Sequence, residues 1–520
     1  MRMAKALWVS IATMASRVLG LIRDQLFVAL IGANRYSDAF VVAFRIPNLL
    51  RDLLAEGSLS AAFIPTFADY ERNKGIEAAY RLANSLIALI LIIVGAIVII
   101  GIALAYPLVA VLAPGFSASQ SDLAAHLTRI MMPFLLLVSL SAIVMGMLNA
   151  QSRFTAPALA PAFFNVGAIV VGIGLWFYQA SPLTTVTGWA LGALLGGLLQ
   201  LSVQLPALWR AGFRVSIKLS RSIFAEPGLR RIGSLMAAAL IGLSATQINI
   251  LVNTIFASHV ESANTYLQIA FRLMQLPLGV FGVAIATVAG AGVAQQVAAK
   301  DIEGVRRTLG SAMRMVAFLN IPSALGLIVL ANPIIALIFE HGRFSAVDTA
   351  GTASALVFYA LGLYGYSAVK VFAPAFYAMG AARVPVFGSI LGMITNVSLN
   401  IILFPILSYR GVALGTACAA TINFLVLFFA WRRLFGGLAT SQWGRQFAQI
   451  LIAASLMAAA AYGTAQLLSP YMLAGIKGQL IKALVPIVVG GLIYFGVVRV
   501  LKIREFSEML KVLRRRQKTK

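Results

Sequence analysis

The sequence predicts an all-α polytopic membrane protein with 14 transmembrane helices, and three observations support this fold class. Hydrophobic residues make up 60% of the 520 residues and charged residues only 11%, with a mean hydropathy of +0.91. Soluble globular proteins are about 45–50% apolar and about 25% charged. Apolar runs of about twenty residues, the length that crosses a bilayer, recur along the whole chain. Lysine and arginine gather in alternate connections between these runs.

The predicted spans follow one another closely, and no connection is long enough to hold a soluble domain. They are 5–31, 37–66, 82–106, 124–149, 157–178, 184–208, 232–257, 264–294, 311–331, 348–377, 384–405, 411–431, 446–468 and 478–500. We expect the first span to be retained rather than cleaved as a signal peptide. The charged Arg17, Arg23 and Asp24 lie within or directly after its apolar part, and no small-residue cleavage pattern is present.

The charge of the connections predicts the orientation of the chain. Connections after the even-numbered spans carry most of the loop lysines and arginines, whereas the opposite connections offer only Arg35, Arg343, Arg410 and Lys477. Because cytoplasmic loops are the ones enriched in Lys and Arg, both termini are expected in the cytoplasm. The net charge of +25 therefore serves orientation and contact with anionic membrane lipids, and no nucleic-acid partner is expected.

An internal duplication predicts the domain organisation. Three pairs of similar segments begin or end at Ala43 and Ala270, Pro107 and Pro333, and Pro157 and Pro385, at offsets of 227, 226 and 228 residues. Six spans fit within this offset, and because six is even, both copies have the same membrane orientation. Two parallel six-helix lobes with a substrate path between them are the expected result. The predicted parts are an N-lobe at 1–211, a C-lobe at 226–437, two additional helices at 438–501 and a basic cytoplasmic tail at 502–520.

The second span carries the most unusual combination of residues. It is apolar enough to enter a bilayer, yet it contains Asp38, Arg45, Arg51, Asp52 and Glu56. A charge at bilayer depth costs at least ~2.5–3.5 kcal/mol, so such residues normally face water or a partner. Pro47 and Gly57 also interrupt the helix, which is tolerated at depth only against protein or a cavity. We therefore expect a polar transport chamber here.

Basic side chains outnumber acidic ones among the candidates for this chamber. Span 1 adds Arg17, Arg23 and Asp24, and the second lobe adds Arg272 and Lys370. A surplus of arginine suits a diphosphate head group, because guanidinium binds phosphate oxygens through two parallel hydrogen bonds. Two alternatives remain open. Arg23–Asp24 or Arg45–Asp52 could be buried ion pairs that only fix helix packing, and Lys370 could snorkel to a surface.

Other polar residues offer little chemistry. Asn396, Asn400 and Thr416 could coordinate a cation through their oxygens, although Asn in a membrane helix usually bonds to a neighbouring helix. The single cysteine excludes an intrachain disulfide, and the three histidines have no metal-ligand spacing. Nucleotide-binding, zinc-protease and serine-nucleophile motifs are absent. We expect no enzymatic activity, no bound metal and no cofactor.

The charged motifs are recognisable as a set. SRVLGLIRD, DAFVVAFRIPNLLRDLLAEGSLSAAFIP, VLAPGF, AFRLMQLPLGVFGVAIATV and VKVFAPAFYAMG together resemble the MurJ (MviN) lipid II flippase family of the MOP exporter superfamily. The resemblance runs through both repeats and the two C-terminal helices.

This resemblance implies an alternating-access transporter, functional as a monomer, in the bacterial inner membrane. It implies movement of lipid II, the lipid-linked peptidoglycan precursor, from the cytoplasmic to the periplasmic leaflet. It further implies a cationic cavity for the diphosphate and a groove along the last two helices for the polyprenyl tail. The family's substrate-binding positions correspond here to Arg17, Arg23, Asp24, Asp38, Arg45, Arg51, Glu56, Arg272 and Lys370.

This chain departs from the family pattern in places. Phe271 and Gln275 stand where acidic residues are common, and Asp52 stands where a basic residue is common. The family's sodium site uses carboxylates in spans 7 and 11, but residues 234–258 contain no Asp or Glu and Asn400 occupies the second position. Coupling to Na⁺ or H⁺ stays open, and these departures favour the membrane potential or protons.

Two other classes of function were weighed against lipid II transport. A sibling exporter would carry another polyprenyl-linked oligosaccharide, such as an O-antigen unit, or drugs. An exporter of cationic drugs would be expected to place acidic residues in its chamber, and the arginine surplus argues against it. A membrane glycosyltransferase would need a carboxylate base or a metal site, and no Asp-x-Asp pair or His/Glu cluster appears in the sequence.

Overall fold

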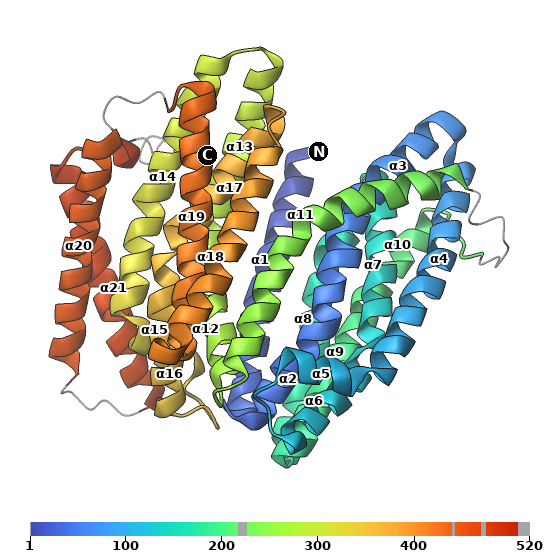
Figure 1. The fold of residues 1–520 in the computed structure, drawn as a ribbon, viewed down its shortest axis with the longest axis horizontal. Coiled ribbons are helices and arrows are strands. Elements are labelled where there is room, and N and C mark those ends of the chain that lie inside the picture. Colours follow the sequence, from blue (N-terminus) through green and yellow to red (C-terminus); the bar gives the residue numbers. More distant parts are fainter. Residues whose placement is uncertain (1, 217–225, 439–442, 470–474, 508–520) are drawn as a thin grey trace. The chain divides into compact units, whose positions relative to one another are not determined.

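A computed structural model describes residues 2–216, 226–438, 443–469 and 475–507 (Figure 1). Within these ranges all regular structure is helical, which confirms the predicted fold class. The chain forms two compact units. Unit 1 comprises Met1–Thr265 with Gly342–Phe344, and unit 2 comprises Tyr266–His341 with Ser345–Lys520.

The helices of unit 1 run from α1 to α11. They are α1 (Arg2–Ile31), α2 (Arg35–Leu50), the π-helix η1 (Arg51–Gly57), α3 (Ser58–Lys74), α4 (Ile76–Ala103), α5 (Ala105–Leu112), α6 (Ala118–Met131), α7 (Pro133–Ala150), α8 (Thr155–Tyr178), α9 (Pro182–Ser202), α10 (Leu205–Arg210) and α11 (Pro227–Ala257). The compact unit therefore includes α11, which packs against α3 and η1, although the repeat assigns that helix to the C-lobe. The lobe boundaries at 211 and 226 stay a prediction.

Unit 2 holds the remaining helices, of which α12 begins three residues before the unit boundary. They are α12 (Ala263–Pro277), the π-helix η3 (Leu278–Gly282), α13 (Val283–Ala298), α14 (Ile302–Val329), α15 (Ala331–Phe339), α16 (Ala346–Leu361), α17 (Leu363–Ala378), α18 (Arg383–Leu407), α19 (Tyr409–Phe435), α20 (Trp443–Leu468) and α21 (Gly475–Val500).

Each of the fourteen predicted spans falls on one of these helices or on a run of them. Among the described residues, ten helices are long and apolar enough to cross a membrane, or eleven if the bent pair α16–α17 counts as one span. The chain is thus a multi-span membrane protein, and the count of fourteen stays a prediction. The run from α2 to α3 is not among the ten. It is divided at η1 into pieces shorter than the ~20 residues that a crossing needs.

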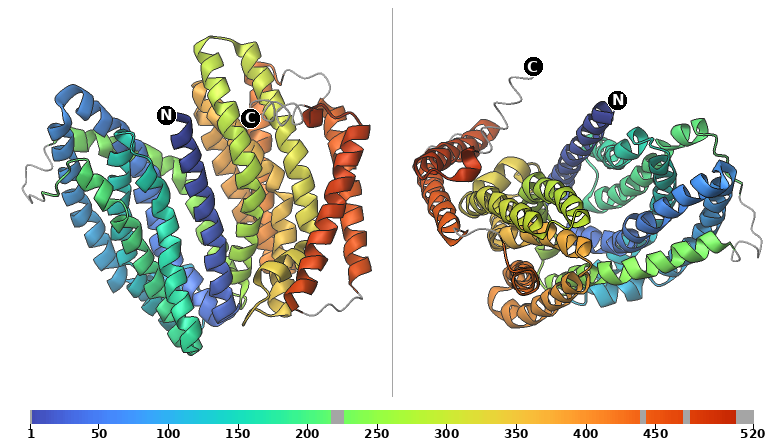
Figure 2. Two further views of the ribbon diagram at one scale, coloured as in Figure 1. Left: turned by 180° about the vertical axis from the view of Figure 1, so that it is seen from behind. Right: turned by 90° about the horizontal axis from the view of Figure 1, so that it is seen from above.

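In unit 1, α8 lies between α1 and α9 (Figure 2). The backbones of α8 and α9 touch, because a Cβ added to Gly167 would lie 2.6 Å from the Cα of Gly196. The hairpin before α16 contributes Gly342–Phe344 to unit 1. Near the C-terminal end of α1, the Arg343 N–H of this hairpin donates to the carbonyl of Ala29 over 2.8 Å. Gly342 is needed there, since its φ is +61° and a Cβ would meet the same carbonyl oxygen. These contacts fix α1 along its length.

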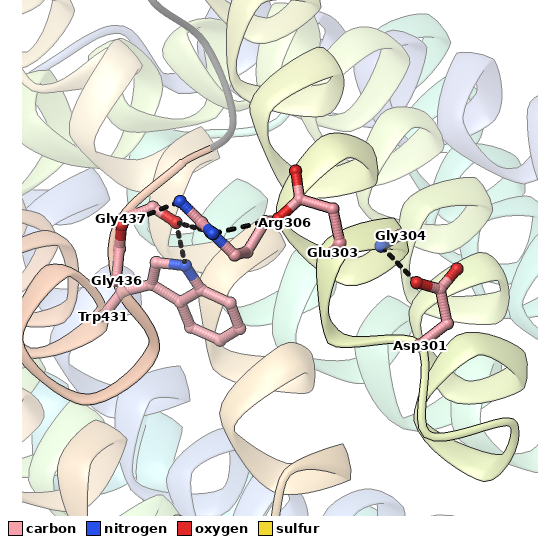
Figure 3. Close-up of polar contacts among 7 residues, drawn as sticks. All are labelled: Asp301, Glu303, Gly304, Arg306, Trp431, Gly436 and Gly437. Carbon is pink, nitrogen blue, oxygen red and sulfur yellow. Dashed lines mark hydrogen bonds and ion pairs between the residues drawn. The ribbon is translucent and has the colours of Figure 1, made fainter.

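In unit 2, α14 is the helix on which others assemble, as it packs against α13, α16, α17 and α20. It begins after Asp301, whose carboxylate accepts the N–H of Gly304 over 2.7 Å (Figure 3). The side chains between α14, α17 and α19 form one buried cluster that includes Phe372, Phe376 and Trp431. Aromatic side chains of α17 and α19 therefore form part of the core of this unit.

The two additional C-terminal helices are fastened to α14 at the point where the chain enters them. The Arg306 guanidinium donates to the carbonyls of Gly437 (Nε, 3.1 Å) and Gly436 (Nη2, 2.9 Å) and forms an ion pair with Glu303 (2.9 Å) (Figure 3). Trp431 donates to the same Gly437 carbonyl over 3.2 Å. Both glycines have positive φ, which lets the end of α19 turn its last carbonyls toward these donors.

A second arginine of α14 fastens the chain where it leaves these helices. Arg314 Nε lies 2.7 Å from Glu505 Oε1, and the two side chains are 10% and 2% exposed. Beside this ion pair, the Tyr494 hydroxyl of α21 donates to the carbonyl of Phe318 over 2.6 Å. The helix pair α20–α21 is thus held against α14 both where the chain enters the pair and where it leaves it. Residues 508–520 of the predicted basic tail lie outside the described residues.

The buried ion pair predicts a large loss of stability on truncation. Glu505→Ala leaves the Arg314 charge buried and unpaired, so we expect it to destabilise the folded protein by about 3–5 kcal/mol. Thermal unfolding of the purified protein in detergent measures this loss. Glu303→Ala is the matched control, because Glu303 is 55% exposed and such a surface pair is worth about 0–1 kcal/mol. Equal unfolding temperatures for the two variants would contradict the prediction.

Candidate functional site

The candidate site in unit 1 starts with the charged turn of α1. Arg23 donates through Nε and Nη2 to a single oxygen of the adjacent Asp24, at 3.1 and 2.8 Å. Both side chains are mostly buried, at 15% and 14% exposure. The predicted ion pair between these neighbours is therefore present. Arg17, nearly two turns earlier on the same helix, is exposed, and no hydrogen bond or ion pair joins it to another described residue.

The π-helix η1 repeats this arrangement. Arg51 donates through Nε and Nη2 to one oxygen of Asp52, at 3.2 and 2.9 Å, and the other Asp52 oxygen accepts Gln247 Nε2 of α11 over 3.4 Å. The alternative pairing of Asp52 with Arg45 is wrong, because Asp52 turns to its own neighbour. The side chain of Glu56 lies outside the described residues.

The break in the second span is a π-helix rather than a simple kink. Pro47 has no N–H to donate, and the Ser58 hydroxyl donates to the Leu53 carbonyl inside η1, so the wide turn is hydrogen-bonded. The second π-helix, η3, begins 227 residues after the first, which is the offset of the sequence repeat. In both copies of the repeat, the helix is therefore widened into a π-helix at the same place. Such π-helical turns are frequent at functional sites.

Asp38 lies in the first turn of α2, completely buried. Its Oδ1 accepts the backbone N–H and the hydroxyl of Thr265, at 2.9 and 2.6 Å, while Thr265 also contacts the Ser37 hydroxyl at 3.0 Å. Asp38 and Thr265 are 227 residues apart, so they occupy equivalent positions in the two repeats. Asp38 thus joins the start of α2 to the start of α12. A role in binding substrate stays a prediction for this residue.

Arg45 is half-buried on α2, and its neighbour Phe44 belongs to a series of touching rings. Phe44 packs on Phe134 of α7 at 5.6 Å between ring centroids, and Phe134 packs on Phe164 of α8 at 5.3 Å. The Arg23 guanidinium lies over the Phe164 ring at 5.4 Å. This connection between α1 and α2 was not predicted from the sequence, because it runs through apolar residues of α7 and α8 that carry no charge signal.

The two candidates in unit 2 lie on different helices. Arg272 is half-buried on α12, and Lys370 is exposed on α17, so the structure does not bury that lysine. Phe271, which stands beside Arg272, packs edge-on against Tyr359 at 5.3 Å and Tyr366 at 6.1 Å. The aromatic side chain at this position therefore belongs to the packing of unit 2.

The residues considered for a cation form a hydrogen-bonded network between α18 and α19. Asn396 donates to the Thr416 hydroxyl over 3.1 Å, and Asn400 donates to the Asn396 side-chain oxygen over 3.3 Å. Thr416 in turn donates to the Val412 carbonyl. Two of the oxygens that a cation would need already accept hydrogen bonds from these neighbours. No group of three or more His, Cys, Asp or Glu side chains that could hold a metal occurs among the described residues.

The arrangement of helices is shared with transporters of one superfamily. The chain matches an inward-facing multidrug resistance MATE family transporter of the MOP superfamily with a TM-score of 0.69 and 18% identity, over 83% of this chain and 98% of that one. A structure of lipid II flippase MurJ in an inward closed conformation matches with a TM-score of 0.79 and 26% identity, over 95% of this chain and 99% of that one. The fold is therefore that of a MOP-type membrane transporter.

Sequence comparison narrows this class to one family. The family model described as lipid II flippase MurJ matches residues 27–481. The probable lipid II flippase MurJ of Rhizobium meliloti (strain 1021) is 34% identical over 87% of this chain and 84% of its own length. The lipid II flippase MurJ of Burkholderia cenocepacia is 33% identical over 87% of this chain and 88% of its own length. The chain belongs to the lipid II flippase MurJ family.

The Asp38 contact predicts a local change in hydrogen exchange. Asp38→Ala removes the acceptor of the Thr265 N–H, so we expect this amide to exchange at least about tenfold faster. Hydrogen-exchange mass spectrometry of a peptide spanning the start of α12 measures the rate. Thr265→Val is the control, because it keeps the amide and its Asp38 acceptor and so keeps the protection. Unchanged exchange in Asp38→Ala would show that this bond does not hold the helix start.

Proposed function

We propose that the protein is a flippase that moves lipid II from the cytoplasmic to the periplasmic leaflet by alternating access. The observation that carries this proposal is membership of the MurJ family across residues 27–481, which includes most of both copies of the repeat. The protein acts in the bacterial inner membrane with both termini in the cytoplasm, as a monomer and without enzymatic activity. The charge bias of the connections supports this orientation.

In this proposal, Arg17, Arg23, Arg45 and Arg51 of unit 1 bind the diphosphate of the substrate. Arg272, in unit 2, is also proposed as a substrate-binding residue. The Arg23–Asp24 and Arg51–Asp52 pairs support this role, since each acid accepts through one edge of the guanidinium and holds the cation in place. The Nη1 edge of Arg23 takes no part in its ion pair and is suited to phosphate oxygens. The neighbouring carboxylate also lowers the cost of keeping the charge inside the protein when no substrate is bound.

Transport of a different polyprenyl-diphosphate oligosaccharide is the alternative, because the same arginines would bind the same diphosphate. Transport of cationic drugs is disfavoured, because the candidate site residues of unit 1 include the four arginines Arg17, Arg23, Arg45 and Arg51. The likeness to a multidrug transporter extends to the fold alone.

Loss of single arginines tests the proposal in cells. In a bacterium depleted of its own flippase, we expect the wild-type protein to restore growth and outer-leaflet lipid II, and we expect Arg23→Ala and Arg272→Ala to abolish both. The reason is that each substitution removes a cation that binds the diphosphate. Membrane levels of folded protein are measured for every variant.

Arg231→Ala is the control for this experiment, because Arg231 forms an exposed ion pair with Asp69. It should restore growth as the wild type does. Normal growth and normal lipid II export with Arg23→Ala and Arg272→Ala would reject the arginine site. Failure of the wild-type protein itself, with folded protein in the membrane, would reject lipid II as the substrate.

We propose that transport does not require sodium. The Asn396, Asn400 and Thr416 network supports this view, because two of its side-chain oxygens accept internal hydrogen bonds and its residues carry no negative charge. Replacing Na⁺ by K⁺ in proteoliposomes should leave the transport of lipid II unchanged, whereas collapse of the membrane potential or of the proton gradient should slow it. Transport that stops when sodium is removed would contradict this expectation.

A further inference from the structure

We propose that two adjacent residues of α8, Phe164 and Asn165, are positioning residues for the arginines of α1. This inference rests on the proposed function, in which Arg17 and Arg23 bind the diphosphate. Neither residue touches the substrate. Each acts through a contact with α1, Phe164 beneath the side chain of Arg23 and Asn165 at the backbone beside Arg17.

Asn165 bonds to the backbone of α1 next to its first arginine. Its Nδ2 donates to the carbonyl of Ser16 over 3.0 Å and to the carbonyl of Pro161, one turn back on α8, over 3.2 Å. Asn165 is 7% exposed. A side-chain donor shared between two helices in this way sets the rotation and depth of one helix against the other. Because Arg17 follows Ser16 directly, this bond fixes the point from which its exposed side chain extends.

Phe164 supports the second arginine. The Arg23 guanidinium lies 5.4 Å from the centre of the Phe164 ring, a distance at which the face of the ring attracts a cation. Asp24 binds the Nε and Nη2 edge of the same guanidinium. The ring and the carboxylate therefore hold the group from two sides. Together they restrict its rotation more than either contact does alone.

The position of Phe164 is itself fixed by close packing. A Cβ added to Gly196 of α9 would lie 2.5 Å from the Phe164 carbonyl oxygen and 2.9 Å from its ring. On its other side the ring packs on Phe134, which in turn packs on Phe44, the neighbour of Arg45. The ring is thus packed against both α9 and α7. A rigid support of this kind reduces the entropy that the arginine loses when it binds a phosphate.

A double-mutant cycle tests the proposal. The affinity for lipid II is measured with purified protein in nanodiscs. Phe164→Leu keeps the apolar bulk and removes the ring, and we expect it to weaken binding about fivefold, the size of a partly desolvated cation–π contact. In an Arg23→Ala background the same substitution should have no further effect, because its influence passes through that arginine. Phe164→Tyr keeps a ring and should restore the affinity of the wild type.

Phe163→Leu is the matched control, because Phe163 is the preceding residue of the same helix and is 36% exposed. It should bind as the wild type does. A second cycle pairs Asn165→Leu with Arg17→Ala, and it decides the matter if Phe164→Leu does not fold. In this second cycle, Asn165→Leu should weaken binding only when Arg17 is present.

The outcomes separate this inference from the function on which it rests. If Arg23→Ala weakens binding while Phe164→Leu behaves like Phe163→Leu, the arginine site stands and the positioning role is overturned. An equal loss from Phe164→Leu with and without Arg23 also overturns it, since that result marks a general loss of structure. If both Arg17→Ala and Arg23→Ala bind lipid II as tightly as the wild type, the arginine site fails, and this inference fails with it.

Discussion

A guanidinium inside a membrane-embedded helix requires a partner that replaces the water it has lost. This protein meets the requirement twice with the same device, an arginine that forms an ion pair with the aspartate next to it in sequence. Arg23–Asp24 stands on α1 and Arg51–Asp52 on the π-helix η1. Because the partner is the adjacent residue, the pair needs no second helix, and the cation stays neutralised wherever its own helix goes. An alternating-access transporter benefits from such independence, since its helices change neighbours during each cycle.

Other contacts hold fixed the helices of each unit. In unit 1 the glycine contact between α8 and α9 places Phe164 and Asn165 against α1. In unit 2, α14 holds the two additional helices through Arg306 and Arg314. Arginine therefore has two structural roles in this chain. On α14 it binds backbone carbonyls or a buried glutamate, and on α1 and η1 it forms a pair that remains partly exposed.

Hydrophobic runs were enough to predict the all-helical fold, and each predicted span falls on a helix or on a run of helices. Pro47 and Gly57 predicted the interruption of the second span, where η1 lies, whereas the π-helix η3, which begins 227 residues later, was not predicted. The sequence could not show which acidic side chain forms an ion pair with each arginine, because Asp52 lies within reach of two arginines along the helix. The contacts of Asp38 with Thr265 and of Asn165 with Ser16 join residues 227 and 149 positions apart, and only the folded chain brings them together. For the polar residues of α18 and α19, composition alone does not distinguish a cation site from a network of amides that bond to each other.

In the proposed mechanism, guanidinium groups recognise two linked phosphates on a lipid. This recognition is tested most directly with purified protein in proteoliposomes and two lipids that share their sugar and polyprenyl chain but carry either a diphosphate or a monophosphate. The account predicts that the diphosphate lipid crosses the bilayer well above the rate in protein-free vesicles and that the monophosphate lipid does not. Equal transport of the two lipids, or transport of the diphosphate lipid that Arg23→Ala leaves intact, would contradict it.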